Sequence, residues 1–258
     1  MRLSACGDGL SYLTDVTADR RATPHAHHLR VQRTARYYTL GEGFTPRTVW
    51  LVLHGYGQLA GSVIQFFSDL ADDESLVVAP EALNRFYLIA PESAPARDRP
   101  VGATWMTRED RASEISDYVE YLDAVYDEVA AGPALDGAQV NVIGFSQGAA
   151  TATRWVTHGR SHLGRLILWG GLMPPETDLS RGSATLRGSR LTLVAGTHDQ
   201  YVTDAALLAE QARLDAARIG YDVIRFDGGH VVSRSAFPQL RSQHTNLPGA
   251  RPTGASDR

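Results

Sequence analysis

The chain has 258 residues, of which 43% are hydrophobic, and this is enough for one large core in a single domain. Its 25 basic and 29 acidic residues leave a formal net charge of −4, which argues against nucleic acid or an anionic membrane surface as a partner. All of the basic residues are Arg, so mechanisms that need a Lys amine, such as a Schiff base, a P-loop or a Ser-Lys dyad, are excluded.

Residues 1–28 are polar and irregular, and we expect a solvated segment that precedes the folded domain. No Cys or further ligand motif accompanies its short histidine cluster, so we predict no metal site; the cluster is His25, His27 and His28.

A single cysteine, Cys6, excludes an intrachain disulfide and favours the cytoplasm. Residues 3–6 resemble a lipoprotein cleavage box, but only Met1 and Arg2 precede them, so the apolar part of a signal is missing unless translation starts upstream. No run reaches the roughly 18 apolar residues of a membrane span, and we expect no integral membrane association.

From residue 29 to 237 the chain alternates between strand and helix patterns. Apolar β-type runs predict strands at 36–40, 48–53, 85–90, 140–143, 166–169, 191–195 and 222–226. Helical spacing predicts helices at 62–70, 111–130, 149–157 and 204–219. This alternation predicts an α/β domain over 29–237 with a mainly parallel sheet and helices on both faces. The Pro-, Gly- and Ser-rich residues 238–258 are expected to form a flexible tail.

Ser146 lies in the segment Gly144-Phe145-Ser146-Gln147-Gly148, which follows an apolar strand and opens a predicted helix. This context is typical of a nucleophile elbow, a tight turn whose glycines avoid neighbouring backbone and whose Ser is exposed at a helix N-terminus. The alternative is an ordinary strand-to-helix turn. We predict that Ser146 is a catalytic nucleophile.

A serine nucleophile needs a base, and His230 is the best placed of the nine histidines. It follows the last predicted strand in a glycine-rich loop that can return the imidazole to the sheet edge, although an ordinary loop position is the alternative. His54 belongs to another loop motif, His158 and His162 follow a helix at the opposite end of the sheet, and His244 is in the tail.

The base needs an acid that holds its tautomer, and we predict Asp199, directly after the strand at 191–195. Asp227 competes because it is near His230 in sequence, whereas Asp204 is more simply the first residue of a helix. The order Ser146, Asp199, His230 along the chain is the order of an α/β-hydrolase triad.

Acyl transfer also needs two donors for the developing oxyanion. The backbone N–H of Gln147 follows from the elbow, and the N–H of Tyr56 is the second candidate. Tyr56 lies in His54-Gly55-Tyr56-Gly57, where the glycines let the backbone turn after the strand at 48–53. His54 is expected to hold this loop by hydrogen bonds rather than to transfer a proton.

Together these motifs resemble the phospholipase/carboxylesterase family of α/β-hydrolases, which includes acyl-protein thioesterases. The resemblance covers residues 30–237 and is carried by the segments 53–57, 144–148 and 170–174, the Asp199 loop and Gly229-His230. It implies that Ser146, Asp199 and His230 form the triad and that Tyr56 and Gln147 form the oxyanion hole. It also implies that Trp105 lies near the substrate cleft.

Two segments depart from the family pattern. Val202-Thr203 stands where a Pro commonly follows a valine pair, and Tyr56-Gly57-Gln58 stands where Leu-Gly-Asp is more frequent. These changes bear on acyl and leaving-group preference more than on catalysis.

About twenty residues separate the strands that end near Trp169 and begin near Leu191, too few for a large cap domain. An open site favours small esters, thioesters or lysophospholipids as substrates. The predicted apolar wall residues, for which core packing is the alternative, are Trp105, Leu172, Met173 and Val202.

The predicted mechanism is that of a serine hydrolase with an acyl-enzyme intermediate, without a metal or organic cofactor. An acyltransferase that uses the same triad and a non-catalytic binding protein of the same fold are the alternatives. The sequence makes no prediction of the oligomeric state.

Overall fold

The structure is a computed structural model that describes residues 23–41, 46–89, 95, 98–130, 138–180 and 183–242. The chain divides into two units, Met1–Thr34 and Ala35–Arg258. The described residues of the first unit, 23–34, form no helix or strand. Cys6 and the lipoprotein-like residues 3–6 lie outside the described residues.

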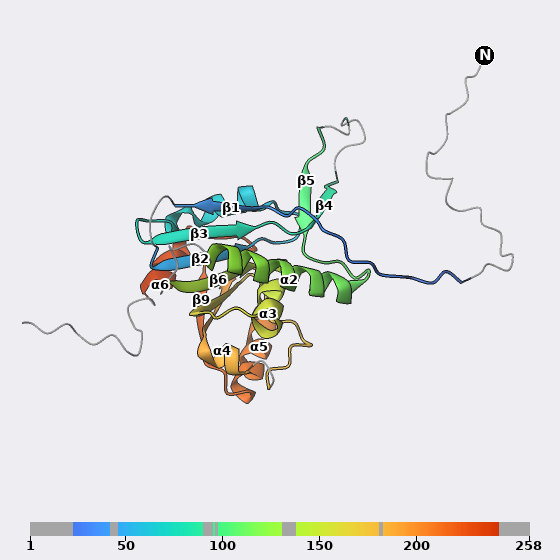
Figure 1. Cartoon of the computed structure of the whole chain (residues 1–258). Helices are drawn as coiled ribbons and strands as arrows, with labels where there is room; N and C mark the ends of the chain where they lie inside the picture. The colour runs from blue at the N-terminus through green and yellow to red at the C-terminus, as the bar shows by residue number, and fades with distance from the viewer. Residues whose placement is uncertain are drawn as a thin grey trace, which may run out of the picture. The chain divides into compact units, whose positions relative to one another are not determined.

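A seven-stranded sheet forms the centre of the described part of the second unit (Figure 1). Its strands lie in the order β1-β3-β2-β6-β7-β8-β9, and every neighbouring pair except β1 and β3 is parallel. Their bounds are Tyr37–Leu40 for β1, Thr48–Leu53 for β2, Ser75–Pro80 for β3, Gln139–Phe145 for β6, Arg165–Trp169 for β7, Arg190–Gly196 for β8 and Tyr221–Phe226 for β9. A separate antiparallel hairpin holds β4 Asn84–Tyr87 and β5 Val101–Thr104.

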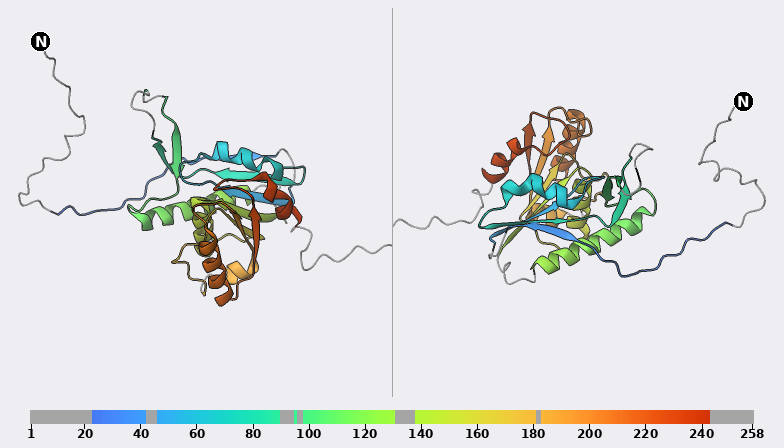
Figure 2. Two further views of the ribbon diagram at one scale, coloured as in Figure 1. Left: turned by 180° about the vertical axis from the view of Figure 1, so that it is seen from behind. Right: turned by 90° about the horizontal axis from the view of Figure 1, so that it is seen from above.

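Helices cover both faces of the sheet, as the two views of Figure 2 show. One face packs against α2 Arg111–Ala130, α3 Gln147–His158, α4 Ser183–Gly188 and α5 Asp204–Ala216. The other packs against α1 Ala60–Val63, the 3₁₀ helix η2 Ile64–Leu70, the 3₁₀ turn η5 Arg234–Ala236 and α6 Phe237–Ser242. The predicted α/β class, with a mainly parallel sheet between two helical layers, is confirmed.

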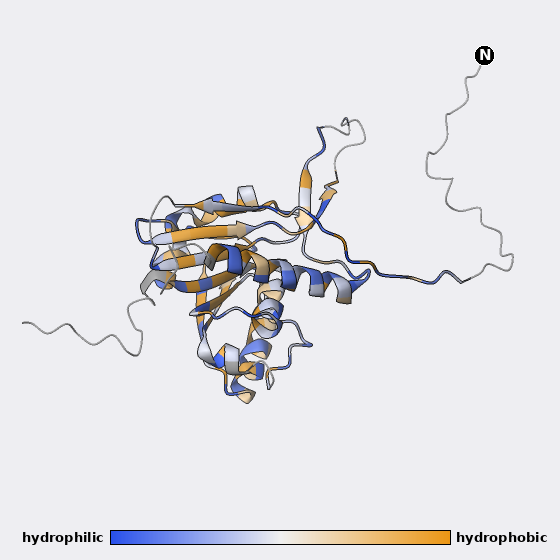
Figure 3. Ribbon diagram, viewed as in Figure 1, coloured by the Kyte–Doolittle hydropathy of each residue, from blue (hydrophilic) through white to orange (hydrophobic). Residues whose placement is uncertain are grey.

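The central strands are apolar in nearly every position because both of their faces are buried. In β2, Val49 and Leu51 enter the core beneath α2 and α3, whereas Trp50 and Val52 enter the core beneath α1 and η2. Successive side chains of a strand point to opposite faces, so a strand covered on both sides needs apolar residues in both registers. Figure 3 shows this concentration of hydrophobic residues in the central strands.

The sequence prediction omitted the strands β3 and β5 and the helices α4 and α6. The strand β3 is a short apolar run next to β2, and its length alone does not separate a buried strand from a helix segment. Residues 85–90, predicted as a strand of the main sheet, correspond to β4, which pairs with β5 instead. The short helices α4 and α6 were also not predicted.

The C-terminal boundary predicted at residue 238 is wrong, because the folded chain continues through α6. Phe237 and Leu240, one helical turn apart, are both buried, and the guanidinium of Arg165 donates to the Leu240 carbonyl oxygen at 2.8 Å. Residues 243–258 lie outside the described residues.

Between β7 and β8 the described residues form a loop and the short α4, with no cap-like domain among them. The sheet edge that carries the polar loops is therefore not covered by an inserted domain in the described part of the chain. None of the helices described has both the length and the apolar character that crossing a membrane requires.

Candidate active site

Ser146 occupies a strained turn between β6 and α3. Its φ of 54° and ψ of −116° lie in a region that non-glycine residues rarely adopt. A Cβ on Gly144 would lie 2.2 Å from the Gly148 carbonyl oxygen, and a Cβ on Gly148 would lie 2.1 Å from that of Leu53. Both glycines are therefore required by close backbone approach, as the predicted elbow demands.

Ser146, His230 and Asp199 come together at the carboxyl edge of the sheet. The Ser146 Oγ lies 2.9 Å from the His230 Nε2, and the His230 Nδ1 lies 2.9 Å from the Asp199 Oδ2. Because a carboxylate only accepts, Nδ1 carries the proton and the Nε2 lone pair faces the serine hydroxyl. The arrangement meets the geometric requirement of the predicted triad.

Asp199 is held as a carboxylate. Its Oδ1 accepts hydrogen bonds from the backbone N–H groups of Tyr201 at 2.8 Å and Val202 at 3.0 Å. Burial alone would raise the pKa of Asp199, but the Val202 N–H and His230 outweigh burial, and the pKa lies below its ordinary value. The acid beside the imidazole is therefore charged at neutral pH.

The competing residues lie elsewhere. The carboxylate of Asp227 is almost fully exposed and faces His198 at 3.4 Å, whereas Asp204 begins α5 and pairs with Arg225 at 2.7 Å. The ring of His158 contacts the Arg154 carbonyl oxygen near the end of α3. His158 is the last residue of α3, His162 follows the helix, and His244 lies outside the described residues.

The predicted oxyanion donors lie on both sides of Ser146. A Cβ on Gly55 would lie 3.1 Å from the Ser146 Cβ, so the loop of Tyr56 runs directly beside the nucleophile. In the described part of the chain, neither the Tyr56 nor the Gln147 backbone N–H has a hydrogen-bond acceptor. Both amides are therefore free to donate to a ligand, which the predicted oxyanion hole requires.

His54 is buried beneath this loop and is held in one tautomer. Its Nε2 accepts from the Ala82 backbone N–H at 3.0 Å, so its Nδ1 carries the proton and donates to the Gly55 carbonyl oxygen at 2.8 Å. Burial lowers the pKa of His54, and this outweighs the Gly55 carbonyl and the charge of Glu81. His54 thus holds the loop by hydrogen bonds, in line with the sequence prediction.

Three of the four predicted wall residues are core residues instead. Trp105, Met173 and Val202 are 2%, 3% and 4% exposed, and all belong to the core beneath α2 and α3. The indole N–H of Trp105 donates to the His54 carbonyl oxygen at 2.8 Å, so this buried side chain holds the start of the loop that carries Tyr56. Leu172 alone is partly exposed.

The exposed apolar residues around the candidate triad are different ones. Tyr201 is 68% exposed, and its ring meets the His230 imidazole edge-on with centroids 4.6 Å apart. Tyr56 and Val231 are also more than half exposed. Sequence reasoning missed Tyr201 and Val231 as rim residues, although each directly neighbours a predicted triad segment.

The chain is similar in sequence to one family model, that of the serine hydrolases (FSH1), over residues 48–239. It matches no curated protein significantly in sequence. No group of three His, Cys, Asp or Glu side chains suited to a metal ion occurs among the described residues.

Solved structures of esterases have the same fold. Acyl-protein thioesterase 2 of Zea mays superposes with a TM-score of 0.60 at 17% identity, covering 82% of this chain and 98% of that one. A carboxylesterase of Bacillus cereus gives 0.62 at 18% identity, covering 82% and 93%. A phospholipase/carboxylesterase of Dyadobacter fermentans gives 0.59 at 18% identity, covering 84% and 99%.

These likenesses confirm the α/β-hydrolase fold and the resemblance that the motifs indicate. The family match spans β2 to α6 and thus includes all of the strands after β1 and every loop of the candidate site. The chain belongs to the serine hydrolase (FSH1) family.

Proposed function

We propose that this hydrolase cleaves carboxylic esters of small molecules through an acyl-enzyme intermediate. Ser146 Oγ attacks the ester carbonyl carbon while His230 Nε2 takes its proton, and the carbonyl oxygen accepts hydrogen bonds from the Tyr56 and Gln147 N–H groups. The protonated His230 then gives its proton to the departing alcohol. Water, deprotonated by the same imidazole, hydrolyses the acyl-serine and restores the enzyme.

The observation that carries this proposal is the pair of 2.9 Å contacts from His230 to Ser146 and to Asp199. The tautomer that Asp199 favours leaves Nε2 as the base on the side of the nucleophile. The charged Asp199 also stabilises the imidazolium that forms during attack. The hydrogen bonds from the Tyr201 and Val202 N–H groups therefore both orient the Asp199 carboxylate and favour its charged form.

The exposed apolar rim favours an acyl or amphiphilic substrate. Tyr56, Tyr201 and Val231 present ring and aliphatic surface beside the triad without a large cap among the described residues. We extend the substrate class to thioesters and lysophospholipids, because the similar Zea mays and Dyadobacter fermentans structures are named a thioesterase and a phospholipase/carboxylesterase. The single Cys supports the cytoplasm as the proposed compartment.

Hydrolysis of p-nitrophenyl acyl esters by the wild type and by Ser146→Ala tests the proposal. We expect turnover by the wild type and its loss in the variant, with unchanged far-UV circular dichroism. Near-normal turnover by Ser146→Ala would contradict the proposal.

Product analysis with a competing alcohol separates hydrolysis from acyl transfer. The free carboxylic acid is expected as the main product, whereas a dominant transesterified product would favour the acyltransferase alternative. A protein that binds the esters and releases no product would be the non-catalytic alternative.

A further inference from the structure

The loop that follows β7, residues 170–177, begins in direct contact with the candidate triad. The Ser146 backbone N–H donates to the Trp169 carbonyl oxygen at 2.9 Å. A Cβ on Gly171 would lie 2.7 Å from the Ser146 carbonyl oxygen, and one on Gly170 would lie 3.1 Å from the His230 Cε1. We call residues 170–177 the β7 loop. A shift of its first residues would change the packing against Ser146 and His230.

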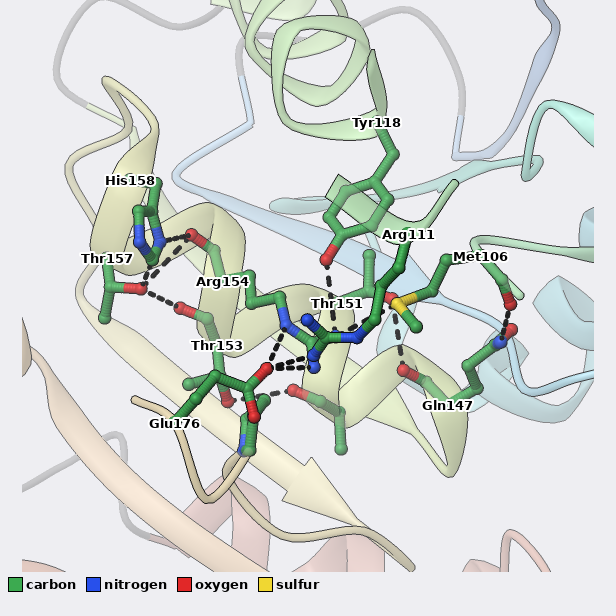
Figure 4. Close-up of polar contacts among 12 residues, drawn as sticks. Met106, Arg111, Tyr118, Gln147, Thr151, Thr153, Arg154, Thr157, His158 and Glu176 are labelled. Atoms are coloured by element: carbon green, nitrogen blue, oxygen red, sulfur yellow. Dashed lines mark hydrogen bonds and ion pairs between the residues drawn. The ribbon is translucent and has the colours of Figure 1, made fainter. Parts of the chain in front are cut away.

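The far end of the β7 loop is held by two arginines that converge on Glu176 (Figure 4). Arg154, from the nucleophile helix α3, donates to the Glu176 Oε1 through Nη2 at 2.6 Å and through Nε at 3.2 Å. Arg111, from the first turn of α2, donates to the same oxygen. Arg154 is only 8% exposed, and a buried guanidinium needs such a partner.

Arg154 also contacts the loop on the other side of α3. Its Nη1 lies 3.5 Å from the Met106 Sδ, and the Met106 carbonyl oxygen accepts from the Gln147 side-chain amide at 2.8 Å. Figure 4 shows Arg154 between Glu176 and Met106, with the Tyr118 hydroxyl directed at its guanidinium. One buried side chain thus joins the β7 loop to the segment that holds the residue after the nucleophile.

The middle of the β7 loop is held from α5. The Met173 N–H donates to the Glu210 Oε1 at 3.1 Å, and the Arg213 guanidinium donates to the Pro174 carbonyl oxygen at 3.2 Å. Leu172, partly exposed, lies between the glycine packed on Ser146 and these anchors. Its backbone is therefore held on both sides, next to the glycine that packs on Ser146.

Glu176 is charged throughout the neutral range. Burial alone would raise its pKa, but the hydrogen bonds from Arg154 and Arg111 lower the pKa of Glu176 to about 2. The carboxylate therefore stays charged near pH 7, and protonation does not switch the contact in this range.

We propose that Glu176, acting through Arg154 and Arg111, is a positioning residue that fixes the β7 loop beside Ser146 and thereby sets which substrate chains the site accepts. This inference rests on the proposed esterase function. A β7 loop held in one position discriminates between substrate chains that differ by a few methylenes. A loop that adopts several positions binds such chains with more similar affinity.

The test compares Glu176→Gln with Asp222→Asn. Asp222 pairs with Arg190 at 2.8 Å where β8 and β9 begin, at the opposite edge of the sheet from the triad. Its variant therefore loses a carboxylate of an ion pair, as Glu176→Gln does, but far from Ser146. Both variants and the wild type are assayed with p-nitrophenyl esters from acetate to decanoate and with acetates of short and long alcohols. Thermal unfolding verifies that each is folded.

We expect Glu176→Gln to change the ratio of kcat/KM between the best and the poorest chain at least about threefold in one of the two series, with KM affected more than kcat. Arg111→Gln, which leaves Arg154 in place, should shift the same ratio in the same direction by less. Asp222→Asn should keep the wild-type ratios.

Wild-type ratios in both series for folded Glu176→Gln would overturn the inference, because a merely stabilising contact lowers the amount of active enzyme without altering ratios. Equal changes in Asp222→Asn would overturn it as well. Absence of ester turnover in the wild type would instead contradict the proposed function itself.

Discussion

The residues beneath the candidate site are buried and hydrogen-bonded, whereas the residues around its rim are exposed. Asp199 has two backbone donors and His54 is held at both ring nitrogens. In contrast, Tyr56, Tyr201 and Val231 present 61%, 68% and 52% of their surface to solvent. Asp199 and His54 are therefore held tightly, so changes to the candidate triad should affect all substrates alike, whereas changes at the exposed rim should affect substrates differently.

The largest effect is expected at Asp199. Asp199→Asn leaves the shape of the site but no longer favours the Nδ1–H tautomer of His230 or stabilises its imidazolium, so kcat should fall about 10³- to 10⁴-fold with every ester. The matched control is Asp227→Asn, which removes a nearly fully exposed carboxylate from the neighbouring loop. A greater loss in Asp227→Asn than in Asp199→Asn would show that the acid is misassigned.

Gly148→Ala tests the elbow itself. The new Cβ would lie 2.1 Å from the Leu53 carbonyl oxygen, so backbone must shift and the free energy of unfolding should fall by about 1–3 kcal/mol. Gly188→Ala is the control, because a Cβ there meets nothing within 4 Å and the residue ends a helix. Urea unfolding measures both, and equal stability of the two variants would contradict the close packing at Gly148.

His54 should make stability depend on pH. Burial lowers its folded-state pKa below the ordinary 6.5, so below that value the unfolded chain takes up a proton that the folded chain resists. The free energy of unfolding therefore has its full value above about pH 6.5 and decreases as the pH falls toward the folded-state pKa of His54.

Urea unfolding of the wild type between about pH 7.5 and about pH 5.5 should show a loss on the order of 1 kcal/mol. His54→Gln keeps an acceptor for the Ala82 N–H but has no proton to gain, so its stability should vary less over the same range. A steeper pH dependence in His54→Gln than in the wild type would contradict a buried neutral imidazole.

The smallest effect is expected at the rim. Tyr201→Ala removes the exposed ring beside His230, so KM should rise about 2- to 10-fold for long-chain esters and less for acetates, with kcat little changed. Leu208→Ala, at a similarly exposed apolar position on α5, should leave both unchanged. A uniform fall in kcat across the ester series would instead indicate that Tyr201 acts on the catalytic groups rather than on substrate binding.

Long or continuous patterns were predictable from the sequence. The strand β2 and the helix α2 have the predicted bounds, because one is apolar in both registers and the other has apolar residues at helical spacing over 20 residues. The proximity of Ser146, Asp199 and His230 was predictable because each follows a strand in a loop of distinctive residues. Parallel strands then bring these loops to one edge.

The environment of single side chains was not predictable. Trp105, Met173 and Val202 are apolar residues in loops near the site, and nothing in the sequence distinguishes a cleft wall from the core below it. The Glu176 contacts join three segments far apart along the chain, so no spacing rule reveals them. The burial of Leu240 depends on Arg165 and the core against which α6 packs.

Covalent labelling by a fluorophosphonate tests the central claim most directly, because such probes react with a serine only when a base activates it. Mass spectrometry of the labelled wild type should place one phosphonyl adduct on Ser146, and His230→Ala should label much more slowly. Absence of labelling in the folded wild type, or an adduct on another residue with Ser146 unmodified, would contradict the assignment.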